Sequence, residues 1–126
     1  MILAIDIGNT NISIGVPIMT GVMMGLLGLS SGTAQLPRVG LDAPTRVIGK
    51  NTADCMKSGA VYGNASTIDG MIDRFYDEYG EKLPVYATGC YSKSIIKHCK
   101  HDITIDENLV LYGLYIIYKK TRDRFS

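Results

Sequence analysis

The residues best suited to chemistry lie near the start of the chain, where an apolar run meets a carboxylate. Ile2 to Ile5 are apolar, Asp6 follows, and the segment from Gly8 to Asn11 adds a glycine, a hydroxyl and two amides. A glycine lets the backbone approach an anion closely, and consecutive turn amides can hold a phosphate oxygen. A carboxylate beside phosphate needs a neutralising ion. Asp6 is therefore expected to hold a hydrated Mg²⁺ indirectly, or to orient a water or a neighbouring amide.

A purely structural interpretation explains the same residues. Asp, Gly and Asn are ordinary turn residues, and Asp6 can accept hydrogen bonds from turn amides. A second stretch, in which Lys50, Asn51 and Thr52 open a helical pattern, is equally ambiguous. These side chains can present donors to a ligand, yet Asn51 or Thr52 as a simple N-cap also accounts for them. The residues alone leave both interpretations open.

The pattern around these residues predicts alternating strands and helices. Residues 2–5 and 12–16 alternate as a strand hairpin joined by the GNTN turn. Short strands are expected at 84–87 and 103–105, helices at 18–29, 52–79, 92–99 and from 106 onwards, and a loop at 35–46. Alternating elements of this kind predict one α/β unit.

Two of the predicted helices have recognisable ends. The amphipathic pattern that ends at Tyr79 is followed by Gly80, which is expected to stop the helix. In the last helix Asp106 is expected to act as the cap, with Glu107 in the first turn and basic residues in the last turn. The basic residues are Lys119, Lys120 and Arg122, and the expected buried face is Leu109, Gly113, Ile116 and Ile117.

Composition excludes several classes of function. The 126 residues carry 13 basic and 12 acidic side chains, for a net charge of +1, without the basic run that nucleic acid or an anionic membrane requires. No apolar run approaches the ~18 residues that span a bilayer. Three cysteines without a paired spacing favour a reducing compartment, so a cytoplasmic location is expected. Cys99 lies between His98 and His101, but these positions point in different directions on a short helix, so they are assigned no metal.

Several motifs, in order, carry a resemblance to a known family. They are DIGNTN at 6–11, TAQLPRV at 33–39, IGKNT at 48–52, SGAVYGN at 58–64, DGMIDR at 69–74, VYATG at 85–89 and LYGLYIIY at 111–118. Together they resemble type III pantothenate kinase, strongly over residues 1–16 and 33–118. That family belongs to the actin-like, sugar-kinase-like ATPase superfamily, works as a homodimer, and phosphorylates pantothenate with ATP in coenzyme A synthesis.

The resemblance implies a fold and a set of site residues. It implies half of an actin-like (ribonuclease H-like) ATPase architecture, with a mixed sheet and packed helices in one domain. In this domain a phosphate-binding hairpin, residues 1–16, joins residues 17–126, which resemble the second domain of the family. Thr52 is implied to contact pantothenate across a dimer interface. The residues implied to bind ATP are Asp6, Ile7, Gly8, Asn9, Thr10, Asn11, Ile12, Ser13 and Gly89.

The departures from the family predict impaired catalysis. Family members are about twice as long, and the missing middle carries the Gly-x-Asp-Arg motif of the general base and the Asp-x-Gly-Thr motif that binds a monovalent cation and ATP. Asp73-Arg74 and Asp123-Arg124 are expected to be solvated charges and no substitute. Cys90 replaces a second glycine near the adenine side. The alternatives are a residual nucleotide binder and a non-catalytic dimer or scaffold, whose apolar face at 18–29 another chain would cover.

Overall fold

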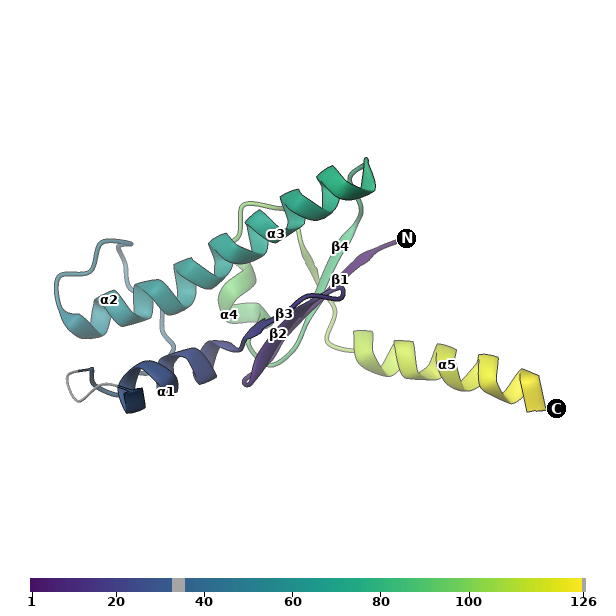
Figure 1. The fold of residues 1–126 in the computed structure, drawn as a ribbon, viewed down its shortest axis with the longest axis horizontal. Coiled ribbons are helices and arrows are strands. Elements are labelled where there is room, and N and C mark those ends of the chain that lie inside the picture. Colours follow the sequence, from purple (N-terminus) through teal and green to yellow (C-terminus); the bar gives the residue numbers. More distant parts are fainter. Residues whose placement is uncertain (33–35, 126) are drawn as a thin grey trace.

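The sheet is the centre of the molecule. The computed structural model describes residues 1–32 and 36–125, and among them five strands form one mixed sheet in the order β3-β2-β1-β4-β5 (Figure 1). The strands are β1 (Leu3–Ile7), β2 (Asn11–Ile14), β3 (Ile18–Thr20), β4 (Val85–Thr88) and β5 (Thr104–Ile105). β1, β2 and β3 pair antiparallel, whereas β1, β4 and β5 pair parallel. The predicted α/β class, the hairpin and the strands near 84–87 and 103–105 are confirmed.

The helices pack mainly against one side of this sheet. They are α1 (Val22–Gly32), α2 (Thr52–Ser58), α3 (Asn64–Tyr79), α4 (Ser92–Ile96) and α5 (Leu109–Phe125). A π-helical turn, η1 (Gly59–Gly63), joins α2 to α3, so the predicted helical region 52–79 is one long rod in Figure 1. Residues 36–46 have no regular structure, as predicted, while Gln35 lies outside the described residues.

Alternation along β1 divides the sheet into a buried and an open face. Leu3, Ile5 and Ile7 are buried, whereas Ala4 and Asp6 are exposed, because successive strand residues point to opposite faces. The buried face joins the core, whose largest fully buried members are Ile5, Ile7, Ile12, Ile14, Val22, Val61, Ile68, Ile72 and Ile95. The side chain of Asp6 is thus directed away from the core and is accessible from solvent.

Two predicted helix ends are confirmed. Asn51 is the N-cap of α2, and its side-chain oxygen accepts a hydrogen bond from the Asp54 amide at 2.9 Å. Gly80 ends α3 with φ +90°, a conformation that favours glycine, and its amide donates to the Tyr76 carbonyl at 2.9 Å. The capping interpretation therefore accounts for Asn51 without any ligand.

The helix predicted at 18–29 is partly wrong. Ile18 to Thr20 form strand β3, because this segment pairs with β2 and extends the hairpin to a third strand. The helix begins only at Val22, after Gly21. A Cβ on Gly21 would lie 2.4 Å from the Asn9 carbonyl oxygen, so the turn between strand and helix requires a glycine here. A local apolar pattern could not reveal this tertiary pairing.

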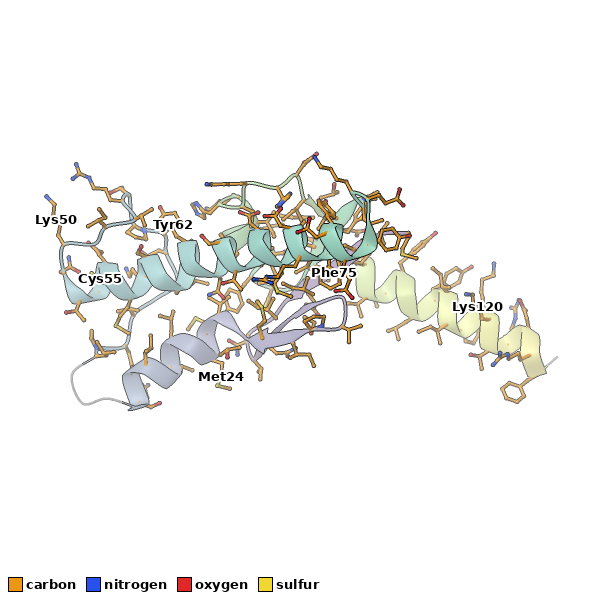
Figure 2. All side chains as sticks on the ribbon, turned by 45° about the horizontal axis from the view of Figure 1, so that its top comes forward. Met24, Lys50, Cys55, Tyr62, Phe75 and Lys120 are labelled. Atoms are coloured by element: carbon orange, nitrogen blue, oxygen red, sulfur yellow. The ribbon has the colours of Figure 1, made fainter. Side chains whose placement is uncertain are left out.

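The last helix also differs from the prediction. None of its described residues is buried, so the expected face of Leu109, Gly113, Ile116 and Ile117 has no core beneath it. Figure 1 shows α5 extending away from the rest of the chain, and Lys120 lies far along it in Figure 2. Glu107 precedes the helix, and the basic residues of the last turn are Arg122 and Arg124. Asp106 accepts the Asn108 amide at 2.9 Å just before the helix starts.

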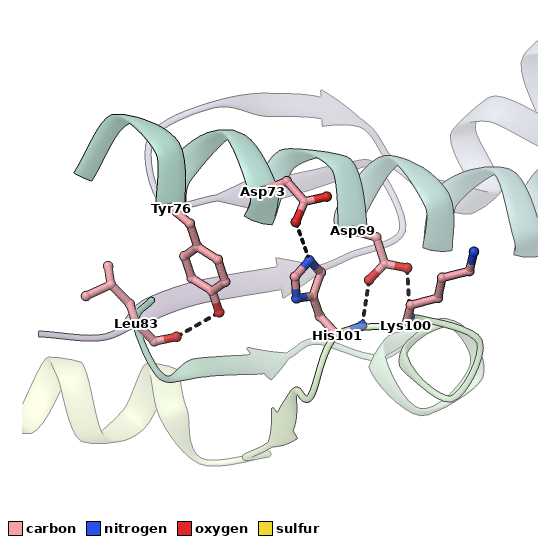
Figure 3. A network of polar contacts seen from close by, with 6 residues as sticks. All are labelled: Asp69, Asp73, Tyr76, Leu83, Lys100 and His101. Atoms are coloured by element: carbon pink, nitrogen blue, oxygen red, sulfur yellow. Dashed lines mark hydrogen bonds and ion pairs between the residues drawn. The ribbon is translucent and has the colours of Figure 1, made fainter. Parts of the chain in front are cut away.

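A polar network fastens the segment after α4 to α3 (Figure 3). The helix predicted at 92–99 ends at Ile96, and the following backbone amides of Lys100 and His101 donate to the Asp69 carboxylate at 2.7 and 3.0 Å. The His101 imidazole contacts Asp73 at 2.7 Å. Asp73, expected to be a solvated charge, has a side chain that is 65% exposed, and it also pairs with His101.

Candidate functional site

The candidate site lies where two parallel strands end. Asp6, near the end of β1, pairs in register with Thr88, the last residue of β4. On the other side of β1, Asp6 pairs with Ser13 of β2. In open α/β sheets, ligands bind at the carboxyl ends of the strands, so this edge is the expected place for one.

Two adjoining pockets open around Asp6. The larger has a volume of about 520 Å³ and is lined by Asp6, Thr88, Gly89, Cys90, Ser92, Lys93, Glu107 and Val110. The smaller, of about 260 Å³, is lined by Ala4, Ile5, Asp6, Ser13, Gly15, Thr88, Leu109 and Val110. They share Asp6, Thr88 and Val110, so Asp6 stands between them. The larger volume is within the range of about 300 to 1,000 Å³ typical of small-molecule sites.

The turn after β4 brings the backbone against Asp6. Gly89 has φ +102°, and a Cβ on it would lie 2.4 Å from the Ile7 carbonyl oxygen and 2.6 Å from Oδ1 of Asp6. Ser92 Oγ donates to the Gly89 carbonyl at 2.8 Å and fixes the turn. Cys90 is exposed and lines the larger pocket. Gly89 and Asp6 thus form one wall of the larger pocket.

The tip of the hairpin is held from behind by α1. The Gly21 amide donates to the Thr10 carbonyl at 2.8 Å, and the Met24 amide donates to the Asn9 carbonyl at 3.2 Å. The Gly8 amide is used within the hairpin, donating to the Asn11 carbonyl at 3.1 Å. In the described part of the chain, the amides of Asn9 and Thr10 have no acceptor. These two backbone amides of the tip are therefore free to donate hydrogen bonds to a ligand.

The implied ATP-binding residues fall into three groups. Asp6, Ser13 and Gly89 line the two pockets around Asp6. The tip from Gly8 to Asn11 lines neither pocket, although the Tyr91 hydroxyl reaches Asn9 Oδ1 at 3.5 Å and the tip thus lies beside the Gly89 turn. Two of the residues, Ile7 and Ile12, are fully buried core side chains.

Two residues that line the larger pocket form an ion pair. Lys93 of α4 pairs with Glu107, which precedes α5, and both side chains are exposed. The hydrogen bond and the charge of Glu107 raise the pKa of Lys93, and those of Lys93 lower the pKa of Glu107. The sequence pattern assigned neither Lys93 nor Glu107 to the site. Lys93 could have been suspected because it follows Gly89 closely in the chain. Glu107 gave no such signal, because it belongs to a separate segment.

Thr52 lies elsewhere. It borders an apolar groove of about 580 Å³ between α1 and the rod of α2 and η1, together with Val22, Leu26, Leu36, Met56 and Ala60. Cys55 and Met24 mark the two helices in Figure 2. This groove shares no lining residue with the pockets around Asp6. The chain therefore does not bring Thr52 and Asp6 together in one cavity.

The cysteine and histidine residues near α4 point to different partners. Cys99 Sγ lies 3.7 Å from the Ala65 carbonyl oxygen, and His98 stacks edge-on against Tyr62 with ring centroids 5.1 Å apart. Burial, followed by the charge of Asp69, raises the pKa of Cys99 to about 12. The described residues contain no group of three metal-ligating side chains. A magnesium ion held by one carboxylate, waters and phosphate oxygens needs no such group.

The fold and site define an α/β protein with a polar pocket at the carboxyl edge of its sheet. A sequence profile described as type III pantothenate kinase matches residues 14–74. A type III pantothenate kinase from Acholeplasma laidlawii is 40% identical, with 94% of this chain and 51% of that protein covered. A type III pantothenate kinase from Rubrobacter xylanophilus is 39% identical, and the match covers 87% of this chain and 44% of that protein.

The resemblance to this family is thereby confirmed, and the chain belongs to the type III pantothenate kinases. It spans about half the length of the curated relatives it matches. A crystal structure of a conserved protein from Campylobacter jejuni, assigned to the Baf family of transcriptional activators, superimposes with a TM-score of 0.64. At 19% identity, over 97% of this chain and 59% of that one, this similarity concerns the fold alone. Within the described ranges, no helix has the length and apolar character needed to cross a bilayer.

Proposed function

We propose that this chain binds Mg-ATP at the pocket around Asp6 and has little or no pantothenate kinase activity. The observation that carries the proposal is the wall formed by the exposed Asp6 carboxylate and the Gly89 backbone, with an ammonium group at Lys93 beside it. Because Gly89 has no side chain, its backbone lies directly against Asp6, and the adjoining pocket of about 520 Å³ has the volume to accept a phosphate group. Asp6 would hold a hydrated Mg²⁺, which neutralises phosphate charge when bound.

The proposed architecture is one half of an actin-like ATPase in a single domain, residues 1–126. The amino-terminal hairpin supplies the two central antiparallel strands, and β1 pairs with β4 through four register partners from Leu3 to Asp6. This pairing supports a fusion in which the hairpin completes the sheet of residues 17–126. We place the protein in the cytoplasm, since the cysteines of the described chain are all free thiols.

Loss of catalysis is proposed because the described residues that line the pockets around Asp6 include no Asp-Arg pair like that of the family's general base. The other carboxylate of the pocket, Glu107, is followed by Asn108 and so does not supply an acidic residue with a neighbouring arginine. Asp73, the carboxylate of the first Asp-Arg pair, is bound to His101, and Asp123 of the second pair lies within α5 beside Arg122. General-base catalysis contributes ~10²- to 10⁴-fold to rate. Without it, and without the monovalent cation site of the family, phosphoryl transfer is expected to be very slow.

The implied pantothenate contact at Thr52 is proposed to need a second chain. Thr52 borders a groove separate from the pockets around Asp6, so one copy cannot bring both to one substrate without rearrangement. In a homodimer, the groove of one copy could face the Asp6 pocket of its partner. Pantothenate binding should therefore rise with protein concentration in the range where the oligomeric mass rises.

Calorimetry with Mg-ATP tests the proposed function. The full chain is expected to bind Mg-ATP, and Asp6→Asn should weaken binding and reduce its dependence on magnesium. Asp77→Asn is the matched control, because Asp77 is an exposed carboxylate of α3 outside both pockets. Absence of binding, or an unchanged isotherm for Asp6→Asn, contradicts the proposal. An ADP-release assay showing pantothenate-dependent turnover contradicts the loss of catalysis.

A second candidate function is a non-catalytic scaffold, and α5 is the observation that favours it. Its apolar side chains are exposed on all sides, with Leu111 66%, Tyr115 54% and Ile117 61% exposed. A helix that is apolar all round is normally buried. A second copy covering α5 predicts a dimer by light scattering, and Ile117→Glu should shift the mass toward the monomer. A monodisperse monomer at high concentration would rule this function out.

A further inference from the structure

The pocket around Asp6 contains one basic side chain, and that side chain is already engaged. Among the residues that line the larger pocket, Asp6 and Glu107 are acidic and Lys93 is basic. Lys93 pairs with Glu107, although the two come from different segments of the chain. The charges of Lys93 and Glu107 cancel, so the negative charge of Asp6 is not balanced by another residue that lines this pocket. A phosphate entering the pocket therefore meets a negative wall unless Lys93 changes partner.

The pair is built so that it can open. The side chains of Lys93 and Glu107 are 74% and 66% exposed, and exposed pairs contribute little net stability because water solvates both ions well. The backbone around them is fixed independently of the pair. Ser92 donates to the Gly89 carbonyl on one side, and the Asp106 amide donates to the Ala87 carbonyl at 2.8 Å on the other. Separation of the pair needs only side-chain rotation.

We propose that Lys93 is a phosphate-binding residue held in reserve by Glu107, and that a polyphosphate displaces Glu107 when it binds beside Asp6. The inference rests on the proposed nucleotide-binding function and adds a specific residue pair to it. A lysine ammonium is a compact charge on a flexible stem, well suited to follow a phosphate oxygen. Magnesium at Asp6 and the ammonium of Lys93 then neutralise the polyphosphate from two sides of the pocket.

Calorimetry with Mg-ATP and with magnesium tripolyphosphate tests this inference on the full chain. Lys93→Ala should weaken the binding of both probes about tenfold, since it removes a charge-assisted contact. Glu107→Gln should strengthen binding two- to fivefold, roughly the worth of an exposed ion pair. A merely structural role for the pair predicts the opposite sign for Glu107→Gln. Lys97→Ala is the matched control, because Lys97 is exposed at the end of α4 and lines neither pocket.

The double variant separates two causes of a gain in affinity. If Glu107 acts by holding Lys93, the gain from Glu107→Gln disappears in the Lys93→Ala background. If the gain persists there, Glu107 acts by its own repulsion, and the reserve role is overturned. Thermal unfolding by circular dichroism confirms that each variant is folded. If Lys93→Ala binds Mg-ATP as tightly as the unmodified chain does, this inference is refuted and the proposed function stands. If the unmodified chain binds neither probe, both the inference and the proposed function are refuted.

Discussion

The backbone of Gly89 lies so close to the Asp6 carboxylate that a Cβ at residue 89 would stand 2.6 Å from Oδ1. The same Cβ would lie 2.4 Å from the Ile7 carbonyl oxygen, which is part of β1 and cannot move aside cheaply. The turn after β4 can therefore approach the end of β1 this closely only because residue 89 is a glycine. This contact sets the shape of the pocket wall.

Gly89→Ala is expected to destabilise the fold. The variant must adopt φ +102° with a side chain and relieve two close contacts, at a cost of roughly 1 to 3 kcal/mol or more. Gly70→Ala is the control, since a Cβ there meets nothing within 4 Å and the position lies inside α3. It should stabilise the helix by up to about 1 kcal/mol. Urea unfolding measures both, and equal stability of Gly89→Ala and the unmodified chain would contradict the described turn.

Asp69→Ala is expected to loosen the segment between α4 and β5. The carboxylate accepts the backbone amides of Lys100 and His101, and its loss leaves both without this acceptor, at a cost of roughly 2 to 3 kcal/mol. Asp77→Ala, on the exposed side of the same helix, should change stability by less than about 0.5 kcal/mol. Hydrogen exchange should show faster exchange of the Lys100 and His101 amides in Asp69→Ala only. Unchanged protection would mean that the network of Figure 3 does not hold this segment.

Thiol labelling should separate Cys99 from the other cysteines. Cys55 and Cys90 are exposed, whereas burial raises the pKa of Cys99 to about 12. At pH 8 only about one Cys99 side chain in 10⁴ is a thiolate, and the thiolate is the reactive form. A chromogenic disulfide reagent should therefore modify two thiols quickly, and Cys99 only on unfolding. Cys99→Ser should leave the fast phase intact, and rapid modification of all three thiols would contradict its burial.

The Lys93–Glu107 pair predicts a definite pH dependence. The hydrogen bond and charge of Lys93 lower the pKa of Glu107, so the folded chain binds its proton less readily than the unfolded chain. The contribution of the pair is therefore present above the ordinary pKa of a glutamate and is lost as the pH falls through the lowered value. Carbon-13 NMR should find Glu107 titrating below its ordinary range, and Lys93→Ala should return it there. A titration that Lys93→Ala does not change would show that the pair is absent in solution.

Local sequence determined much of the fold. The alternation of β1 and β2 is visible in the printed residues because strand side chains have a period of two. The α3 pattern and its Gly80 stop are equally local, since helix periodicity and positive φ depend on near neighbours. The ordered motifs from residue 6 to residue 118 were enough to identify the family resemblance.

Tertiary contacts decided the remainder. Ile18 to Thr20 became a strand because β2 offered a free edge. α5 has no buried residue because most of its length extends away from the sheet (Figure 1). The site depends on the same kind of contact, since Asp6, Gly89 and Glu107 come from three separate segments. Sequence by itself indicated Asp6 and Gly89, but neither Lys93 nor Glu107, as candidate site residues. Only the pairing of β1 with β4 decided which of them meet, because that distance depends on long-range packing rather than on neighbours in the chain.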